Sequence, residues 1–198
     1  MTHDPSNRPH YWQRYSDGGG HWRMGEPPPG SDLAAMRRGL GREAGAVPEM
    51  WRFYTTLNAD GHRTRELLAE HLSLVLFAVH QQSKAQPMHR GGVGVGAAMR
   101  SLRDSGKFSV DAVDRRFAAA ATATSPSELG MHLRGLVTQL RGIGQPLDYT
   151  RLFRDLRDCH YPERVSAVRR GWGAQYFVWK PRPADVNSDG ISDAAASA

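Results

Sequence analysis

Hydrophobic residues recur along most of this chain with the spacing of amphipathic helices. The clearest stripe runs over residues 64–83, where apolar side chains return every three or four positions, as in a helix that faces a core. Shorter stretches predict further helices at residues 33–40, 48–57, 94–102, 109–121, 127–140, 149–156 and 162–179. The strict alternation typical of half-buried strands is nearly absent. The pattern therefore predicts an all-α fold.

Capping residues and short breaks divide this pattern into separate helices. Ser31-Asp32 and Ser109 stand where a side-chain oxygen can accept a hydrogen bond from a free amide of the first helical turn. Ser125 is followed three residues later by Glu128, which is the spacing of a capping box. The Gly- and Pro-containing breaks are short, at residues 91–92, 125–126 and 142–146. Such connections predict a compact helical bundle.

The same stripes predict which side chains form the core. Residues on the inner face of each helix are expected to be buried, where truncation of a leucine to alanine costs about 2–5 kcal/mol. The predicted core contains Trp51, Tyr54, Leu68, Leu72, Leu76, Phe117, Leu133 and Leu136.

Composition changes near both ends and predicts three regions. Residues 1–30 contain runs of three glycines and three prolines with little periodicity, and they are predicted to form a flexible aromatic/Gly/Pro-rich arm. Its aromatic rings complicate that interpretation, since aromatics in a free tail often dock onto another surface. Residues 31–180 are predicted to be the helical domain, and residues 181–198 a disordered tail.

The sequence gives no sign of secretion or of a membrane span. Its first residues are polar and proline-dotted, unlike a signal peptide. The longest apolar stretch, residues 72–79, is far shorter than the roughly 20 residues that span a bilayer. The single cysteine, Cys159, excludes an intramolecular disulfide and a multi-cysteine zinc site. A cytoplasmic protein is expected.

Charge adds a possible partner to this picture. The 198 residues carry 26 Lys and Arg against 20 Asp and Glu, and 23 of the basic residues are arginine. Residues 31–180 hold 22 basic and 14 acidic residues, so the predicted domain has a net charge of +8. Arginine grips phosphate oxygens in pairs and stacks on bases, whereas lysine would serve solubility equally well. Nucleic acid is therefore one candidate partner; solvated helix faces and arginine-rich codon usage are the other explanation.

The glycine run Gly92–Gly96 resembles a phosphate-binding loop. A dinucleotide fingerprint needs a preceding strand and a later acidic residue, and a Walker loop needs Gly-Lys-Ser/Thr. Neither condition is met. A helix N-terminus near Arg90 that approaches a phosphate backbone remains a physically sensible alternative.

Other candidate chemistry is weaker. Residues 185–193 match the first nine positions of a calcium loop, but Ala196 stands where the bidentate glutamate belongs. Four histidines at positions 62, 71, 80 and 89 are nine residues apart, so neighbours on a helix would face opposite ways. No nucleophile, histidine and carboxylate fall at a recognisable motif spacing, which is weak evidence against an enzyme. No metal, cofactor or catalytic residue is predicted.

Groups of arginines remain as the strongest candidate site. Several predicted helices each offer a basic edge, and residues three or seven apart share a helix face. Together such edges could form a groove for a phosphate backbone. The predicted nucleic-acid surface contains Arg37, Arg38, Arg100, Arg103, Arg115, Arg116 and Arg134.

A set of short motifs occurs in a fixed order along residues 31–180: LAAMRRG at 33–39, VPEMWRFY at 47–54, GVGVG at 92–96 with Met99-Arg100, VDRRF at 113–117, HLRGL at 132–136, PLDY at 146–149 and WGAQYF at 172–177. No single motif is diagnostic. The ordered set resembles the CasB family, the small subunit of the type I-E CRISPR surveillance complex, Cascade. The N-terminal arm and the residues after Lys180 lie outside the resemblance.

The resemblance implies an all-helical, non-catalytic subunit present in two copies. Its implied partners are the large subunit and the backbone subunits of Cascade, its own second copy, the guide RNA and the target DNA. Its implied role is to hold the opened R-loop, at the displaced strand and at the backbone of the target strand. Because guide pairing supplies the sequence information, the subunit needs only a basic surface that grips backbone non-specifically.

Two other function classes stay open at this point. A stand-alone helical DNA-binding regulator would need a recognition helix with base-reading side chains, for which Gln139 with Arg141 is a poor candidate. A helical enzyme would need a catalytic constellation, and none is recognisable.

Overall fold

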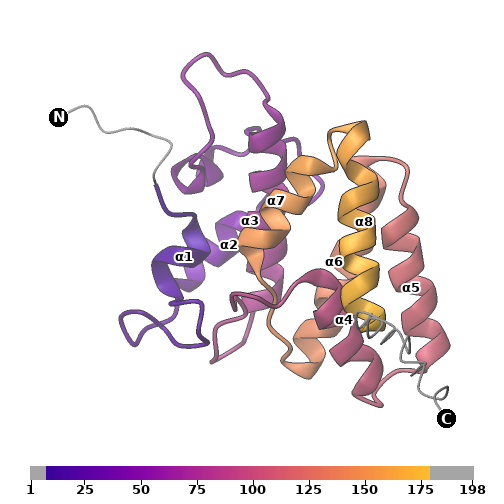
Figure 1. Cartoon of the computed structure of the whole chain (residues 1–198). Helices are drawn as coiled ribbons and strands as arrows, with labels where there is room; N and C mark the ends of the chain where they lie inside the picture. Colours follow the sequence, from indigo (N-terminus) through magenta and orange to yellow (C-terminus); the bar gives the residue numbers. More distant parts are fainter. Residues whose placement is uncertain (1–7, 179–198) are drawn as a thin grey trace, which may run out of the picture.

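Helix α3 (Arg65–Gln81) lies at the centre of the fold in the computed structural model, which describes residues 8–178 (Figure 1). The side chain of its N-cap, Thr64, accepts a hydrogen bond from the amide of Leu67. Thirteen of its 17 residues are buried. Helices α2 (Gly30–Arg38), α6 (Pro126–Ile143) and α7 (Tyr149–Asp158) all pack against it. The stripe over residues 64–83 is therefore the core helix of the domain.

The remaining elements complete the predicted all-α fold. They are α1 (Tyr11–Tyr15), the 3-10 helix η2 (Pro48–Phe53), α4 (Val95–Asp104), α5 (Val110–Thr122) and α8 (Pro162–Phe177). Within residues 8–178 there is no strand, and two isolated backbone bridges join Ser16 to Trp22 and His89 to Leu147. The prediction of a helical bundle is confirmed.

Helices α4, α5, α6 and α8 form the second half of the bundle. Helix α4 packs against α5, α6 and, most extensively, α8. Its contact with α8 depends on Gly96, where an added Cβ atom would collide with the carbonyl oxygen of Trp172. In Figure 1, α5 and α8 stand side by side at the right, while α1 and α2 lie at the left. The two halves meet where α3 packs against α6 and where α7 packs against α8.

The N-terminal segment from residue 8 belongs to the folded domain, which corrects the predicted flexible arm over residues 1–30. Trp12 is fully buried, and its Nε1–H donates to Thr150 Oγ1 at 3.0 Å. Tyr11 is also buried and donates its hydroxyl hydrogen to Asp32 at 2.9 Å. Burial of an aromatic side chain removes about 150–250 Å² of surface from water. The stabilisation from burying these rings is larger than the entropic cost of ordering a segment rich in glycine and proline. Residues 1–7 lie outside the described part of the chain.

A buried carboxylate fastens this segment to α3. Glu70 is 0% exposed and accepts hydrogen bonds from His10, from the backbone and hydroxyl of Thr55, and from the backbone and hydroxyl of Thr56. Burial alone would raise the pKa of this carboxyl group, but the hydrogen bonds outweigh burial and hold the pKa below its usual value. Glu70 thus joins three separate stretches of chain.

The predicted core is correct for five of its eight members. Tyr54, Leu76, Phe117, Leu133 and Leu136 are buried, whereas Leu68 and Leu72 are half-buried at the edge of the core.

Trp51 is wrong as a core residue, because 52% of it is exposed. It lies in η2, which has the three-residue repeat of a 3-10 helix. Met50 and Phe53, three residues apart, are buried on one side, and the intervening Trp51 faces outward.

Two of the three predicted caps are present. The side chain of Ser109 accepts from the amide of Ala112, and that of Ser125 accepts from the amide of Glu128. The cap at Ser31-Asp32 is wrong, because both residues lie inside α2, which begins at Gly30, three residues before the predicted start, and has Pro29 as its N-cap.

None of the helices within residues 8–178 has the length and apolar character that a membrane crossing requires. The predicted tail over residues 181–198, including the calcium-loop-like stretch, lies outside the described residues.

Candidate nucleic-acid interface

Arg37, the first residue of the predicted surface, caps a buried helix. Its Nη1 lies 3.4 Å from the carbonyl oxygen of Ala78, and Nη1 of Arg141 lies 3.2 Å from that of Val79. Both carbonyls are in the last turn of α3, where no amide is available within the helix. A cation at this end also compensates the helix dipole. Arg37 is therefore committed in part to the fold.

Basic side chains satisfy the last turns of three other helices in the same way. Arg100 Nη1 donates to the carbonyl oxygen of Gln175 in α8 at 2.9 Å, and Arg169 Nη2 donates to that of Ala123, the C-cap of α5, at 2.6 Å. Lys107 Nζ donates to a carbonyl oxygen near the end of α6 at 3.1 Å. In each case the donor and the acceptor come from different elements or loops, so these basic side chains connect separate parts of the bundle.

Arg103 also takes part in packing between helices. Its Nε lies 3.0 Å from Asp114 of α5 in a half-exposed ion pair. The hydroxyl of Tyr176 donates to the same carboxylate, and the Arg103 guanidinium lies 5.9 Å from the Tyr176 ring. This cluster connects α4, α5 and α8. Arg103 therefore contributes to packing between these helices, and its charge is paired with that of Asp114.

The other four predicted residues are exposed. Arg115 and Arg116 lie on α5 and Arg134 lies on α6, and these two helices pack against each other. Within residues 8–178 none of the three makes an ion pair. Arg38 is also exposed, with a long 3.5 Å ion pair to Glu49. Of the seven predicted residues, these three remain exposed and, within the described residues, without an ion pair on two helices that pack together, and they are called the basic face on α5 and α6 below; Arg38 lies on α2.

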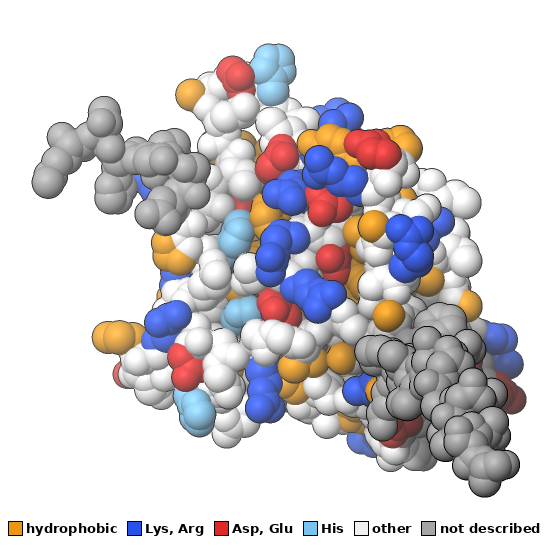
Figure 2. All heavy atoms as spheres, in the orientation of Figure 1, with side chains coloured by type: hydrophobic (Ala, Val, Ile, Leu, Met, Phe, Trp, Pro, Cys, Tyr) orange, Lys and Arg blue, Asp and Glu red, His pale blue; other side chains and the backbone are white. Residues whose placement is uncertain are grey.

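A further basic cluster lies over α7 and the start of α8 and contains none of the predicted residues. Figure 2 shows the face of the molecule that carries it, with Lys and Arg side chains gathered in the middle and Asp and Glu between them. Asp158 accepts from both Arg157, at 3.0 Å, and Arg164, at 3.2 Å. Arg65 and Arg164 each place a guanidinium over the Tyr161 ring, at 4.2 and 4.5 Å. The three-residue spacing of arginines 151, 154 and 157 was the available signal for a shared face.

The glycine run serves a turn and tight packing. Gly92 has φ +81°, and its amide donates to the Asp148 carboxylate at 2.9 Å. Added Cβ atoms would collide with Gln175 at Gly94 and with Trp172 at Gly96. An amide of the glycine run is therefore already bonded to a carboxylate, three residues before α4 begins. The arrangement disfavours the phosphate-loop interpretation.

Three of the four regularly spaced histidines have buried imidazole rings. His71 Nδ1 lies 2.6 Å from the Tyr54 hydroxyl, and His80 Nδ1 lies 2.9 Å from the Tyr149 hydroxyl. His89 Nδ1 accepts from the amide of Tyr149 at 3.2 Å. Burial lowers the pKa of all three imidazoles, that of His80 to about 3. Residues 8–178 contain no group of three or more His, Cys, Asp or Glu side chains that could hold a metal ion.

The fold and the contacts of the arginines define the class of protein. It is a small helical protein in which some arginines connect helices and others are exposed on the surface. Residues 32–177 match the family model described as CRISPR-associated protein Cse2. The chain belongs to this family, also called CasB, which supplies the small subunit of the type I-E Cascade complex. The predicted resemblance is confirmed.

Solved structures agree with this assignment. The crystal structure of CasB from Thermobifida fusca is 29% identical, with a TM-score of 0.65, over 83% of this chain and 92% of that chain. CasB from M. ruber has the same fold, at 20% identity and a TM-score of 0.59, over 84% of this chain and 90% of that chain. No curated protein matches the chain at the sequence level.

Proposed function

We propose that this protein is a non-catalytic Cascade subunit that binds nucleic-acid backbone and stabilises the R-loop. The observation that carries the proposal is the basic face on α5 and α6. Arg115, Arg116 and Arg134 are exposed there and make no ion pair within residues 8–178, while many other arginines link helices. These three side chains are free to reach phosphate oxygens.

The energetics of R-loop formation suit such a face. The heteroduplex that forms is about as stable as the DNA duplex it replaces, so a few contacts to backbone can shift the balance. Guanidinium groups bind phosphate oxygens in pairs, and each neutralised phosphate releases counterions. The ligands of this face are the displaced non-target strand and the backbone of the target strand.

The proposal includes the surroundings of the subunit. Its partners are the large subunit, the backbone subunits, a second copy of itself, the guide RNA and the target DNA, in the cytoplasm. A basic face of three arginines is small, so neighbouring subunits complete the groove in which the strand lies. Binding by the assembled complex is therefore stronger than binding by the isolated chain.

The test is charge reversal of the face in the assembled complex. Arg115→Glu/Arg116→Glu and Arg134→Glu should weaken target-DNA binding by about tenfold or more for every target sequence, since a hydrogen bond to a charged group is worth about 1.5–3 kcal/mol. The salt dependence should also become shallower, by about 0.7–0.9 in log–log slope for each lost phosphate contact.

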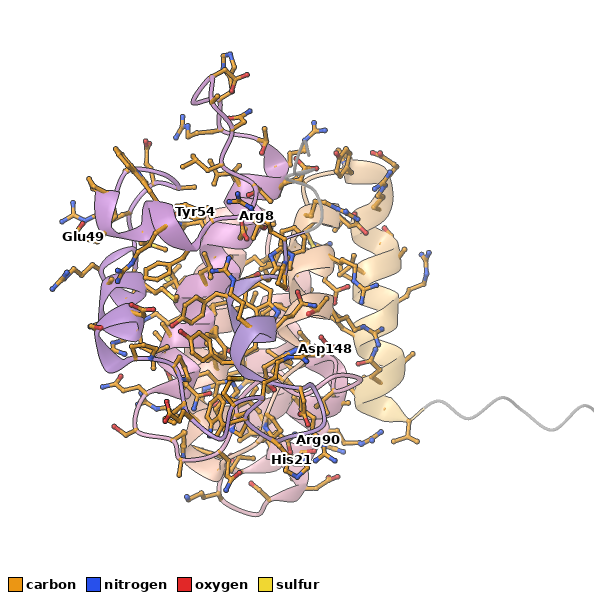
Figure 3. All side chains as sticks on the ribbon, turned by 90° about the vertical axis from the view of Figure 1, so that its left-hand side faces the viewer. Arg8, His21, Glu49, Tyr54, Arg90 and Asp148 are labelled. Carbon is orange, nitrogen blue, oxygen red and sulfur yellow. The ribbon has the colours of Figure 1, made fainter. Side chains whose placement is uncertain are left out.

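The matched control is Arg8→Glu/Arg14→Glu, which changes net charge by the same amount as the double variant. Both control residues are exposed and lie in the N-terminal segment, on the opposite side of the molecule from α5 (Figures 1 and 3). Incorporation into the complex is measured first, by size-exclusion chromatography. Unchanged affinity and salt slope in both face variants, with normal incorporation, would refute the proposal.

A further inference from the structure

An open hollow lies beside the exposed Trp51, at the end of the molecule formed by η2 and the loops around it. The hollow has a volume of about 570 Å³, within the range of about 300–1,000 Å³ that ligand sites occupy. Its large exposed apolar side chains are Trp51 and Leu57, which are 52% and 39% exposed. Small residues form much of the rest, at positions 44–46, 59 and 61.

Trp51 is held in place although it is exposed. Its Nε1–H donates to the carbonyl oxygen of Gly45 at 2.7 Å. Met50 and Phe53, on either side in η2, are buried and fix the helix against the core. Figure 3 shows Glu49 of the same helix at the outer edge of the molecule and Tyr54 turned inward. The indole is therefore a preorganised aromatic surface.

The rim of the hollow is polar. Arg63 and Glu43 both line it, and Arg63 Nη1 lies 3.1 Å from Glu43 Oε2 in an exposed ion pair. Asn58 adds an amide side chain, and the loop backbone adds hydrogen-bonding groups. An aromatic wall with polar groups around it matches a flat heterocycle, whose faces are apolar and whose edges carry donors and acceptors.

Basic side chains lie next to the hollow. Arg42, which precedes Glu43 of the rim, is exposed and makes no ion pair within residues 8–178. Arg38 is exposed and pairs with Glu49 of η2, the helix that carries Trp51. A phosphate group bound by Arg38 or Arg42 would therefore lie near η2 and the rim of the hollow.

We propose that an unpaired nucleobase of a single strand stacks on Trp51 in this hollow. The inference rests on the proposed function, and it names the ligand more closely: a single strand whose bases are accessible. Stacking on an aromatic side chain beside basic residues is tolerant of sequence, because every base has a π-face. A protein partner would need about 800 Å² on this side, far more than two apolar side chains provide.

The experiment compares two oligomers of equal length and charge, measured by fluorescence anisotropy with the full chain at low salt. One is a 12-nucleotide oligothymidylate, and the other is a 12-unit abasic deoxyribose-phosphate oligomer. The wild-type chain should bind the oligothymidylate roughly tenfold more tightly, as expected for stacking of one base. Trp51→Ala should lower the affinity for oligothymidylate to that for the abasic oligomer, and Trp51→Phe should retain most of the preference.

Met24→Ala is the matched control, because Met24 is an apolar residue that is 83% exposed elsewhere on the molecule. It should leave the preference unchanged. Circular dichroism confirms that each variant is folded. Equal binding of both oligomers by the wild-type chain, or a preference that survives in Trp51→Ala, overturns the stacking proposal and leaves backbone binding standing. If neither oligomer binds, the stacking proposal is overturned, whereas the proposed function, which concerns the assembled complex, is decided by its own charge-reversal test.

Discussion

Arg100 of α4 donates a hydrogen bond of 2.9 Å to the carbonyl oxygen of Gln175, in the last turn of α8. Helices α4 and α8 are therefore joined twice, by this bond and by the close approach at Gly96. The same use of a basic side chain recurs at the ends of α3, α5 and α6. The arginines of this protein thus contribute to helix packing as well as to its exposed surface.

The first prediction concerns Arg100. Arg100→Ala should lower the free energy of unfolding by about 1.5–3 kcal/mol, because a hydrogen bond from a charged donor is lost and a carbonyl in the last turn of α8 is left unsatisfied. Urea denaturation followed by circular dichroism measures the change. Arg115→Ala, at an exposed position, is the control and should stay within about 0.5 kcal/mol of wild type. Equal stability of the two variants would exclude a capping role.

A second prediction uses two helical glycines. Gly96→Ala should be strongly destabilising, because the new methyl group meets the backbone of Trp172 and α4 must move away from α8. Gly135→Ala should be neutral or stabilising by up to about 1 kcal/mol, since nothing lies within 4 Å of the added Cβ atom and alanine favours helix. Thermal unfolding of both variants measures the difference. A Gly96→Ala protein as stable as Gly135→Ala would contradict this packing.

The third prediction tests the buried N-terminal segment. Trp12→Ala should cost about 3–5 kcal/mol, as for other large aromatic side chains removed from a core. Met24→Ala changes an exposed residue of the same segment and should have little effect. Chemical denaturation compares the two variants. A flexible segment, in contrast, would make them equally stable.

The fourth prediction is a loss of stability in acid. Below pH 6.5 the unfolded chain takes up a proton at His80, whereas burial keeps the folded form neutral down to a pKa of about 3. Stability from this group is therefore complete above pH 6.5 and falls as the pH drops towards 3. The loss is about 1.4 kcal/mol per pH unit, or about 2 kcal/mol at pH 5. The lowered pKa values of His71 and His89 act in the same direction.

Denaturation curves at pH 7.5, 6 and 5 measure this loss. His80→Gln, which binds no proton in either state, should make the dependence on pH shallower. A free energy of unfolding that stays constant from pH 7.5 to 5 in the wild-type chain would contradict the burial of these imidazoles as neutral groups.

Helical periodicity was enough to predict α3, because its stripe is broad and its neighbours cover it on several sides. It failed at Trp51, since a repeat of three and a repeat of 3.6 differ little over six residues. It also could not show that Arg37 and Arg100 bond to helix ends, because the carbonyls they bond lie 41 and 75 residues away in sequence. Arg115, Arg116 and Arg134 are exposed, as their positions outside the apolar stripes predict. The spacing of residues within one helix predicts which side chains face solvent, but it does not predict contacts with other helices.

The bond between Trp12 and Thr150 spans 138 residues, and this separation sets an order of events during synthesis. Ribosomes add about 5–20 residues per second, so roughly 7–28 s pass between the appearance of the indole and that of its partner. During that interval α1 lacks α7, against which its tryptophan is later buried. Helix α1 can contact α3 early in synthesis, but the packing around Trp12 is complete only after α7 has been made.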